Sequence, residues 1–369
     1  MPPAGNQSEQ NYFVREGIKA LLVSFRRYGA VCAAGDEMSK AMMQDDTAEV
    51  LEAGVMSRDG IDRRGFLKCM AWVGTGLAWS FVGGVPVSHV FGQAPKGMKA
   101  ADFSFVQISD SHLGFNKPAN ADVTATLMAA LAKIDALEKA PDFLIHTGDL
   151  THSSKPEEFD ALQQILGAKR QVFYVPGEHD TSVDDGKMYL ERYGKGTKGN
   201  GWYSYDHKGV HFIALVNVVQ LEGMGKLGAE QLTWLKQDLA GLKPSTPIVV
   251  FAHIPLWAIY PDWGWGTADS EQALALLKRF GSVTVLNGHI HQVMQKVEGN
   301  VAFHTAMSTA FPQPAPGTAP SPGPMKVPAD KLRDVLGLTE VHFVAQKHDL
   351  AIVDATLSGA AVMKAGSGA

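Results

Sequence analysis

The sequence predicts an α/β protein in which helices cover a largely parallel sheet. Short apolar runs alternate with longer segments that carry apolar residues at helical spacing, which is the order of a parallel sheet with crossover helices. Several of the short runs stop at Gly, Pro, Asp or His, as strands do at the rim of an open sheet. The 369 residues carry a net charge of −5 and ordinary apolar content, which is typical of a globular protein.

The first half of the sheet is predicted between residues 103 and 175. The expected elements are strands at Phe103–Ile108, Phe143–His146 and Gln171–Val175 and helices at Ala119–Ala140 and Lys155–Gly167. Pro118 and Pro141 bound the first helix, and Pro-Glu-Glu gives the second helix good first-turn chemistry.

The second half is predicted to begin with an antiparallel hairpin, Trp202–Tyr205 and Val210–Val216, joined by a turn that ends in Gly209. Further expected elements are helices at Gly228–Leu239 and Glu271–Phe280, strands at Ile248–Ala252 and Val283–Leu286, a hairpin of Gln292–Glu298 and Val301–Thr305, and two strands within Val341–Leu357. Phe311–Pro328 is rich in Pro, Gly, Ala and Ser and is expected to be a loop or lid.

An export signal is predicted before the folded domain. Arg63-Arg64 precede an uncharged run, Met70–Val87, and the small-residue pattern Gly92-Gln93-Ala94. The paired arginines resemble the twin-arginine signal of bacteria. We therefore expect the twin-arginine translocation machinery as a partner and a periplasmic or extracellular location.

The predicted domains are an N-terminal extension at 1–55, a signal peptide at 56–94 and a mature domain at 95–369. The extension is either helical or untranslated, and a start at Met56 is favoured. An uncleaved membrane anchor is the alternative to cleavage, because the apolar run approaches the length that spans a bilayer. Its glycines and the exit at Pro86 favour cleavage, so no stable anchor is expected.

Both cysteines, Cys32 and Cys69, precede the mature domain. Any metal there would be held by His and carboxylates, which suit Mn, Fe or Zn. The charges form no long runs, so no nucleic-acid polymer is expected as a partner.

Five of the predicted strand ends carry potential metal ligands. In chain order they are Asp110-Ser111-His112, Gly148-Asp149, Gly177-Glu178-His179-Asp180, His253 and Gly288-His289-Ile290-His291. Each alone is weak evidence, because Asp-x-His pairs and single histidines in strands are common. Their shared position predicts that the side chains meet at one rim.

This series resembles the calcineurin-like metallophosphoesterase superfamily over residues 103–305. The resemblance implies a four-layer sandwich of two mixed β-sheets flanked by helices. It also implies two divalent or trivalent metal ions, of which one would be held by Asp110, His112 and His291. The other would be held by Glu178, His253 and His289. Asp149 would bridge both ions, and His179 would face the phosphoryl group of the substrate.

The implied function is hydrolysis of a small-molecule phosphomonoester or phosphodiester. Two metal ions lower the pKa of a bound water, and the resulting metal-bound hydroxide attacks phosphorus. His179 would stabilise the developing charge or protonate the leaving oxygen. The alternative is a metal-binding or ligand-sensing protein on the same fold with little or no turnover.

Two positions depart from the family pattern. Glu178 stands where most members have Asn, and its charge should strengthen retention of the second metal. His152 stands where many members have an acid that orients the substrate-facing histidine, so either His152 or Asp180 is a candidate for orienting His179. Because His152 is not the tyrosine of purple acid phosphatases, and the protein-serine/threonine-phosphatase signature is missing, the closest branch is expected to be the bacterial class III cyclic-nucleotide phosphodiesterases.

An aromatic segment follows His253 and is the predicted contact for the rest of the substrate. Its members are Trp257, Tyr260, Trp263 and Trp265. Such rings are able to stack on a nucleobase or aryl group. Packing of this segment on the core explains the same residues equally well.

Overall fold

A computed structural model describes residues 76–82, 85–91, 102–167, 170–219, 221, 223–344 and 349–359, all within the unit 64–369. The predicted extension, the Arg63-Arg64 pair, the Gly92-Gln93-Ala94 pattern and both cysteines lie outside the described residues. Within the predicted signal segment, β1 (Gly76–Val82) and β2 (Val85–Phe91) pair as an antiparallel hairpin. None of the helices described combines the length and apolar character that crossing a membrane requires.

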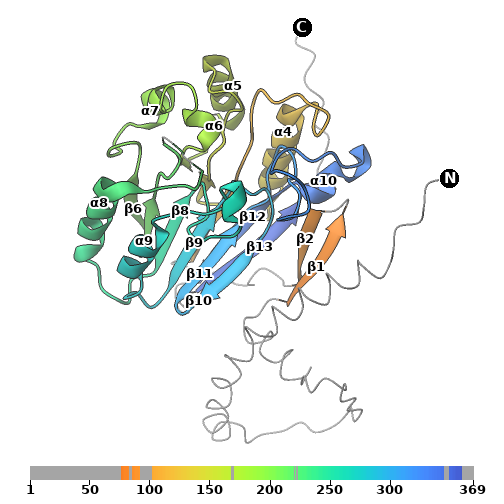
Figure 1. The fold of residues 1–369 in the computed structure, drawn as a ribbon. Coiled ribbons are helices and arrows are strands. Elements are labelled where there is room, and N and C mark those ends of the chain that lie inside the picture. Colours follow the sequence, from red (N-terminus) through yellow and green to blue (C-terminus); the bar gives the residue numbers. More distant parts are fainter. Residues whose placement is uncertain are drawn as a thin grey trace, which may run out of the picture. The chain divides into compact units, whose positions relative to one another are not determined.

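A five-stranded sheet has the order β13-β12-β3-β4-β5, and its neighbouring strands β12 and β13 are labelled in Figure 1. Its strands are β3 (Phe103–Ile108), β4 (Phe143–His146), β5 (Val172–Tyr174), β12 (Gly337–Val344) and β13 (Asp349–Thr356). The first three run parallel, and Ile108 lies opposite His146, which lies opposite Tyr174. The loops that follow these strands therefore begin at one level of the sheet.

A six-stranded sheet has the order β10-β11-β9-β8-β7-β6. Its strands are β6 (Tyr203–His207), β7 (Val210–Ala214), β8 (Ile248–Ala252), β9 (Val283–Asn287), β10 (Gln295–Glu298) and β11 (Val301–Thr305). The inner four run parallel, and both predicted hairpins are confirmed. The alternation of predicted strands and helices suggested a single sheet, and this prediction was wrong. The two mixed sheets that the family resemblance implies are confirmed.

An aromatic core joins the two sheets. Phe105 of β3 stacks on Phe143 of β4 with ring centroids 5.1 Å apart, and it meets Phe212 of β7 edge-on at 5.5 Å. The alternate residues Val106 and Ile108 point the other way, into the core under the helices. This two-residue period buries both faces of β3, as expected for a strand inside a layered fold.

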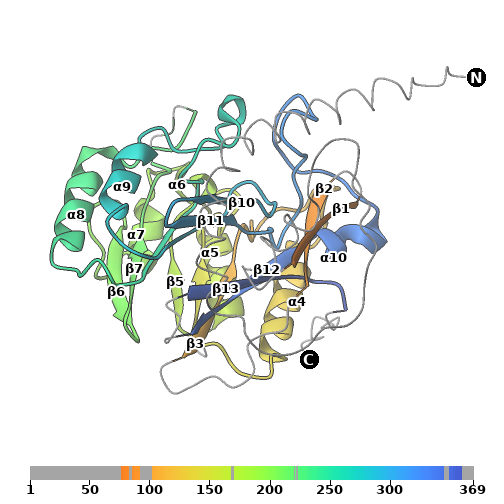
Figure 2. The ribbon, with the colours of Figure 1, turned by 90° about the horizontal axis from the view of Figure 1, so that it is seen from below.

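Helices form the two outer layers (Figure 2). Those packed on the five-stranded sheet are α4 (Val123–Asp135), α5 (Pro156–Leu166) and α7 (Lys187–Tyr193), and those on the six-stranded sheet are α8 (Gly228–Ala240) and α9 (Ser270–Leu277). The helix expected at Ala119–Ala140 begins later because Asp122 caps it, accepting from the Ala125 N–H at 2.9 Å, and it ends earlier, at Asp135. Short helices α6 (Glu178–Thr181) and α10 (Leu332–Val335) and helix α7 were not predicted.

Candidate metal centre

The carboxyl ends of β3, β8 and β9 and the loops after β4 and β5 bring all seven predicted metal ligands together. The first group is Asp110, His112 and His291, with one ligand atom of each within 4.8 Å of the others. The His291 Nε2 lies 3.2 Å from Asp110 Oδ1 and 3.2 Å from His112 Nε2. Both sheets contribute to this group, since Asp110 and His112 follow β3 and His291 follows β9.

The second group is Glu178, His253 and His289, which also meet within 4.8 Å. Glu178 Oε2 lies 2.8 Å from His253 Nε2, and Glu178 Oε1 lies 3.0 Å from His289 Nδ1. The glutamate side chain thus reaches both histidines with its two oxygens, one to each.

Asp149 lies between the two groups. Its Oδ2 is 3.4 Å from His112 Nε2 and 3.5 Å from His253 Nε2. One Asp149 oxygen therefore approaches a histidine of each group, which is the geometry that a bridging ligand would need.

The histidine tautomers show that these side chains fit a cation. His291 Nδ1 donates to the Phe311 carbonyl at 2.6 Å, and His253 Nδ1 donates to the Thr147 carbonyl at 2.7 Å. A carbonyl only accepts, so each neutral ring presents a lone pair at Nε2. These lone pairs face the oxygens of Asp110 and Glu178, an arrangement that is favourable only when a proton or a metal cation lies between nitrogen and oxygen. The donor set of imidazoles and carboxylates matches Mn, Fe or Zn.

The electrostatics and hydrogen bonding of the second group lead to the same conclusion. Burial disfavours the imidazolium of His253, but Asp149 and Glu178 raise its pKa well above the usual range. Burial also disfavours the charged Glu178, yet His289 and His253 hold its pKa well below the usual range. The His289 Nε2 atom is buried without a hydrogen-bond partner in the described part of the chain, which a metal ligand bond would relieve.

The backbone is strained at most of the ligands. Five of the seven have left-handed φ values, namely Asp110 (54°), His112 (41°), Asp149 (52°), His289 (70°) and His291 (55°). For residues with a side chain this region costs on the order of 1–2 kcal/mol each. Such strain gathers at functional sites, where the surrounding structure enforces the conformation.

A buried row of polar side chains supports Asp110. Gln107 donates to the Thr147 hydroxyl at 3.0 Å, which donates to Ser109 at 2.7 Å, and Ser109 donates to Asp110 Oδ2. A Cβ at Gly288 would come within 2.1 Å of Ser109 Oγ and 2.6 Å of Asp110 Oδ2. Glycine is therefore required here, because a side chain would displace the Asp110 carboxylate.

His179 lies beside both groups and is held by main-chain atoms. Its Nδ1 donates to the His152 carbonyl at 2.7 Å, and its own N–H donates to Asp149 Oδ1 at 3.0 Å. Its ring meets that of His112 edge-on with centroids 4.7 Å apart. Burial opposes the charged form, but Asp149 and Glu178 raise the pKa of His179.

The two side chains predicted to orient His179 do not make the hydrogen bond to its Nδ1, which goes to a main-chain carbonyl. The Asp180 carboxylate accepts from the N–H groups of Gly177, Leu150 and Thr151 at 2.8–3.0 Å, and burial with the nearby Asp149 raises its pKa to about 7. The His152 ring stacks on His179 with centroids 4.8 Å apart, while its carbonyl makes the orienting bond. A main-chain acceptor leaves no side-chain signal, so the sequence did not reveal it.

The aromatic segment packs on the protein itself. Trp257 meets Phe303 of β11 at 5.0 Å, Trp263 meets Tyr260 and Trp265 at 5.1 Å each, and Trp265 is fully buried. Within the described ranges, none of these rings makes a ring contact with the candidate ligands. Their predicted role in binding substrate remains a prediction.

Phe311 is a site residue that the sequence did not indicate. The sequence predicts a loop or lid at Phe311–Pro328, and residues 311–328 form a loop. The Phe311 side chain, however, is buried. Its ring stacks on His112 with centroids 4.7 Å apart, and its carbonyl fixes His291. Phe311 is the first residue of a Pro-rich segment. That composition indicates a loop and does not indicate that the Phe311 ring packs at the site.

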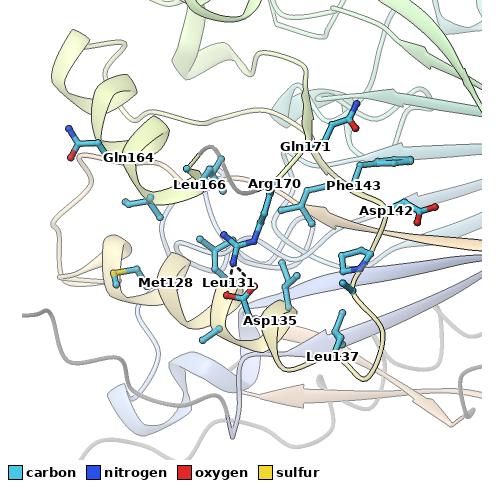
Figure 3. A pocket seen from close by; sticks show the side chains of 17 residues that line it. Met128, Leu131, Asp135, Leu137, Asp142, Phe143, Gln164, Leu166, Arg170 and Gln171 are labelled. Carbon is cyan, nitrogen blue, oxygen red and sulfur yellow. Dashed lines mark hydrogen bonds and ion pairs between the residues drawn. The ribbon is translucent and has the colours of Figure 1, made fainter.

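A groove of about 910 Å³ lies between α4 and α5 (Figure 3). Its lining residues include Leu131, Leu166 and Phe143, and also Arg170 and Asp135, which pair with each other. None of the predicted ligands lines it, so it is separate from the metal centre.

A family model for calcineurin-like phosphoesterases matches residues 103–293, more than half of the chain. The chain belongs to this family. It is 28% identical over 219 residues to a 3',5'-cyclic-nucleotide phosphodiesterase of Nostoc sp., covering 56% of this chain and 79% of the relative. It is 27% identical over 222 residues to a probable glycerophosphodiester phosphodiesterase of Arcobacter nitrofigilis, covering 55% and 77%. The protein is thus a phosphoester hydrolase by family.

Two solved structures share the fold at 13% identity. A purple acid phosphatase from yellow lupin seeds superimposes with a TM-score of 0.52 over 75% of this chain and 55% of that chain. The anchor in the inner membrane complex of Plasmodium gives 0.51 over 71% and 87%. These two similarities establish only that the chain shares the two-sheet fold.

Gly288→Ala should disrupt the first ligand group. The added methyl clashes with Ser109 and Asp110, so we expect less bound metal and a loss of about 1–3 kcal/mol in unfolding free energy. Elemental analysis and urea unfolding measure the two effects. Gly241→Ala is the matched control, since no atom lies within 4 Å of a Cβ there. Equal metal content in both variants would contradict the close packing around Gly288.

Proposed function

We propose that this protein is a dinuclear metal-dependent phosphoesterase that acts on small phosphodiesters. The observation that carries the proposal is the position of Asp149 Oδ2, 3.4 Å from a histidine of one ligand group and 3.5 Å from a histidine of the other. Each group offers two histidines and one carboxylate besides this shared oxygen. The names of the bacterial relatives, which act on cyclic-nucleotide or glycerophosphodiester substrates, favour a diester over a monoester.

The chain's own residues supply positioning and proton transfer in this proposal. Metal ions held by the two groups supply Lewis acidity and activate a water. His179, fixed at Nδ1 by the His152 carbonyl, presents Nε2 as a donor to a phosphoryl or leaving oxygen. A donor at Nε2 requires the protonated ring, because Nδ1 already donates to the carbonyl.

Metal content and turnover test the proposal directly. The purified chain should hold about two metal equivalents and hydrolyse bis(p-nitrophenyl) phosphate with Mn, Fe or Zn. The variant with both His289→Ala and His291→Ala should lose metal and activity. His207→Ala is the control, because it also removes an imidazole but lies at the opposite end of its sheet.

Two outcomes would separate the alternatives. Two bound metals without turnover on mono- or diesters would favour a metal-binding or ligand-sensing protein on this fold. One equivalent or none in the wild type would contradict the dinuclear site itself.

Glu178→Asn tests whether the glutamate is tuned to this site. The shorter amide cannot keep both contacts with His253 and His289 and removes a charge, so we expect weaker retention of the second metal and about tenfold or more loss of turnover. Metal titration and steady-state kinetics measure these effects. Glu191→Gln, an exposed change on α7, is the control. A gain of activity in Glu178→Asn would instead indicate a site that has drifted from catalysis.

We also propose export by the twin-arginine route, with cleavage after Ala94. The proposal is supported by the order of paired arginines, apolar run and small residues. Replacing both Arg63 and Arg64 with Lys should keep the protein in the cytoplasmic fraction, and the wild type should appear in the periplasmic or extracellular fraction. Wild-type protein that stays with carbonate-washed membranes would show an uncleaved anchor instead.

A further inference from the structure

A row of basic and aromatic side chains borders the metal centre beside His112. The Lys117 ammonium nitrogen lies 6.0 Å from the ring centroid of Phe115. The Phe115 ring meets His152 edge-on at 5.1 Å, and His152 stacks on His179 at 4.8 Å. The row therefore leads from an exposed lysine to the histidine that we place next to the phosphoryl group.

Main-chain contacts fix this row in position. The Asn120 N–H donates to the Lys117 carbonyl at 2.9 Å, and the Asn120 side chain donates to the Ala310 carbonyl at 2.6 Å. The His152 N–H donates to the Leu113 carbonyl at 2.9 Å, which joins the loop after β4 to the loop after β3. Lys117 and His152 thus belong to two loops that are tied together.

His152 offers a hydrogen-bond donor to a ligand. Its Nδ1 lies 3.4 Å from His112 Nδ1. A metal on His112 Nε2 would leave the ring proton on Nδ1, where His152 Nδ1 is placed to accept it. The proton of a neutral His152 then sits on Nε2, which has no partner among the residues that the structure describes, and the ring is only half-buried.

Lys117 supplies an unpaired positive charge. It is exposed, and no carboxylate in the described part of the chain pairs with it. A lysine is a mobile point charge that binds phosphate well, and an unpaired one beside a phosphate site attracts a further anion. A phosphate group, with up to two charges and three acceptor oxygens, suits a charged donor and a neutral donor together.

We propose that Lys117 and His152 form a subsite for a second phosphate of the substrate, beside the phosphoryl group that is hydrolysed. The proposal rests on the phosphoesterase function proposed above and narrows its substrates to phosphoesters that carry a further phosphate. The subsite only binds, so no bond forms or breaks there.

Matched phosphonates test the subsite without turnover, because their C–P bonds are not hydrolysed. Calorimetry on the metal-loaded full chain compares the affinity for pentane-1,5-bisphosphonate with the affinity for pentylphosphonate. A second pair, propane-1,3-bisphosphonate and propylphosphonate, tests a shorter distance between the two phosphonate groups. The wild type should bind each bisphosphonate about five- to tenfold more tightly than the matching monophosphonate. This gain is in addition to the factor of about two that arises because a bisphosphonate has two equivalent ends. This preference should shrink as salt is added, because Lys117 is exposed.

Lys117→Ala should abolish the preference for the bisphosphonate, and Lys236→Ala should retain it. Lys236 is an exposed lysine on α8, so the control removes the same charge elsewhere. His152→Phe keeps a ring for stacking but lacks the N–H, and it should lower the preference in the same direction.

Equal affinity of the wild type for both members of each pair, or a preference that survives in Lys117→Ala, would overturn the subsite. Hydrolysis of bis(p-nitrophenyl) phosphate is measured on the same preparations. Its absence would count against the proposed function, while the phosphonate affinities would still decide the subsite.

Discussion

The site depends on one electrostatic constraint: imidazole lone pairs face carboxylate oxygens at close range. His291 Nε2 lies 3.2 Å from Asp110 and His253 Nε2 lies 2.8 Å from Glu178, and backbone carbonyls hold the proton of each ring on its far nitrogen. A metal cation or a proton between nitrogen and oxygen satisfies this arrangement, and without either the two atoms repel. Because Asp110 follows a strand of one sheet and His291 a strand of the other, a cation there also ties the two sheets together at this rim.

The rest of the structure holds these side chains in position. The aromatic core around Phe105 fixes one sheet against the other, and the level ends of β3, β4 and β5 place their loops side by side. The left-handed conformations of five ligands cost free energy that this packing must offset. The hydroxyl row from Thr147 through Ser109 then sets the Asp110 carboxylate.

Two features distinguish this chain's site chemistry. With Glu178 in the second group, each ligand group has one carboxylate and two histidines besides the shared Asp149, so the two groups carry the same number of charged ligands. His179 is oriented by a main-chain carbonyl, which frees the His152 ring to stack on it and to contact His112. The orienting bond therefore does not depend on the identity of the side chain at position 152.

The sequence by itself determined the elements and the candidate ligands, because strand periodicity and strand-ending residues are local properties of the chain. Ile248–Ala252 and Val301–Thr305 were predicted with the bounds that the structure has. Only the tertiary structure decided which strands pair within each of the two sheets, since alternation of strands and helices does not specify strand pairing. It also decided the roles of Phe311, Asp180 and the His152 carbonyl, because those depend on contacts between loops distant in sequence and on main-chain atoms that every residue shares.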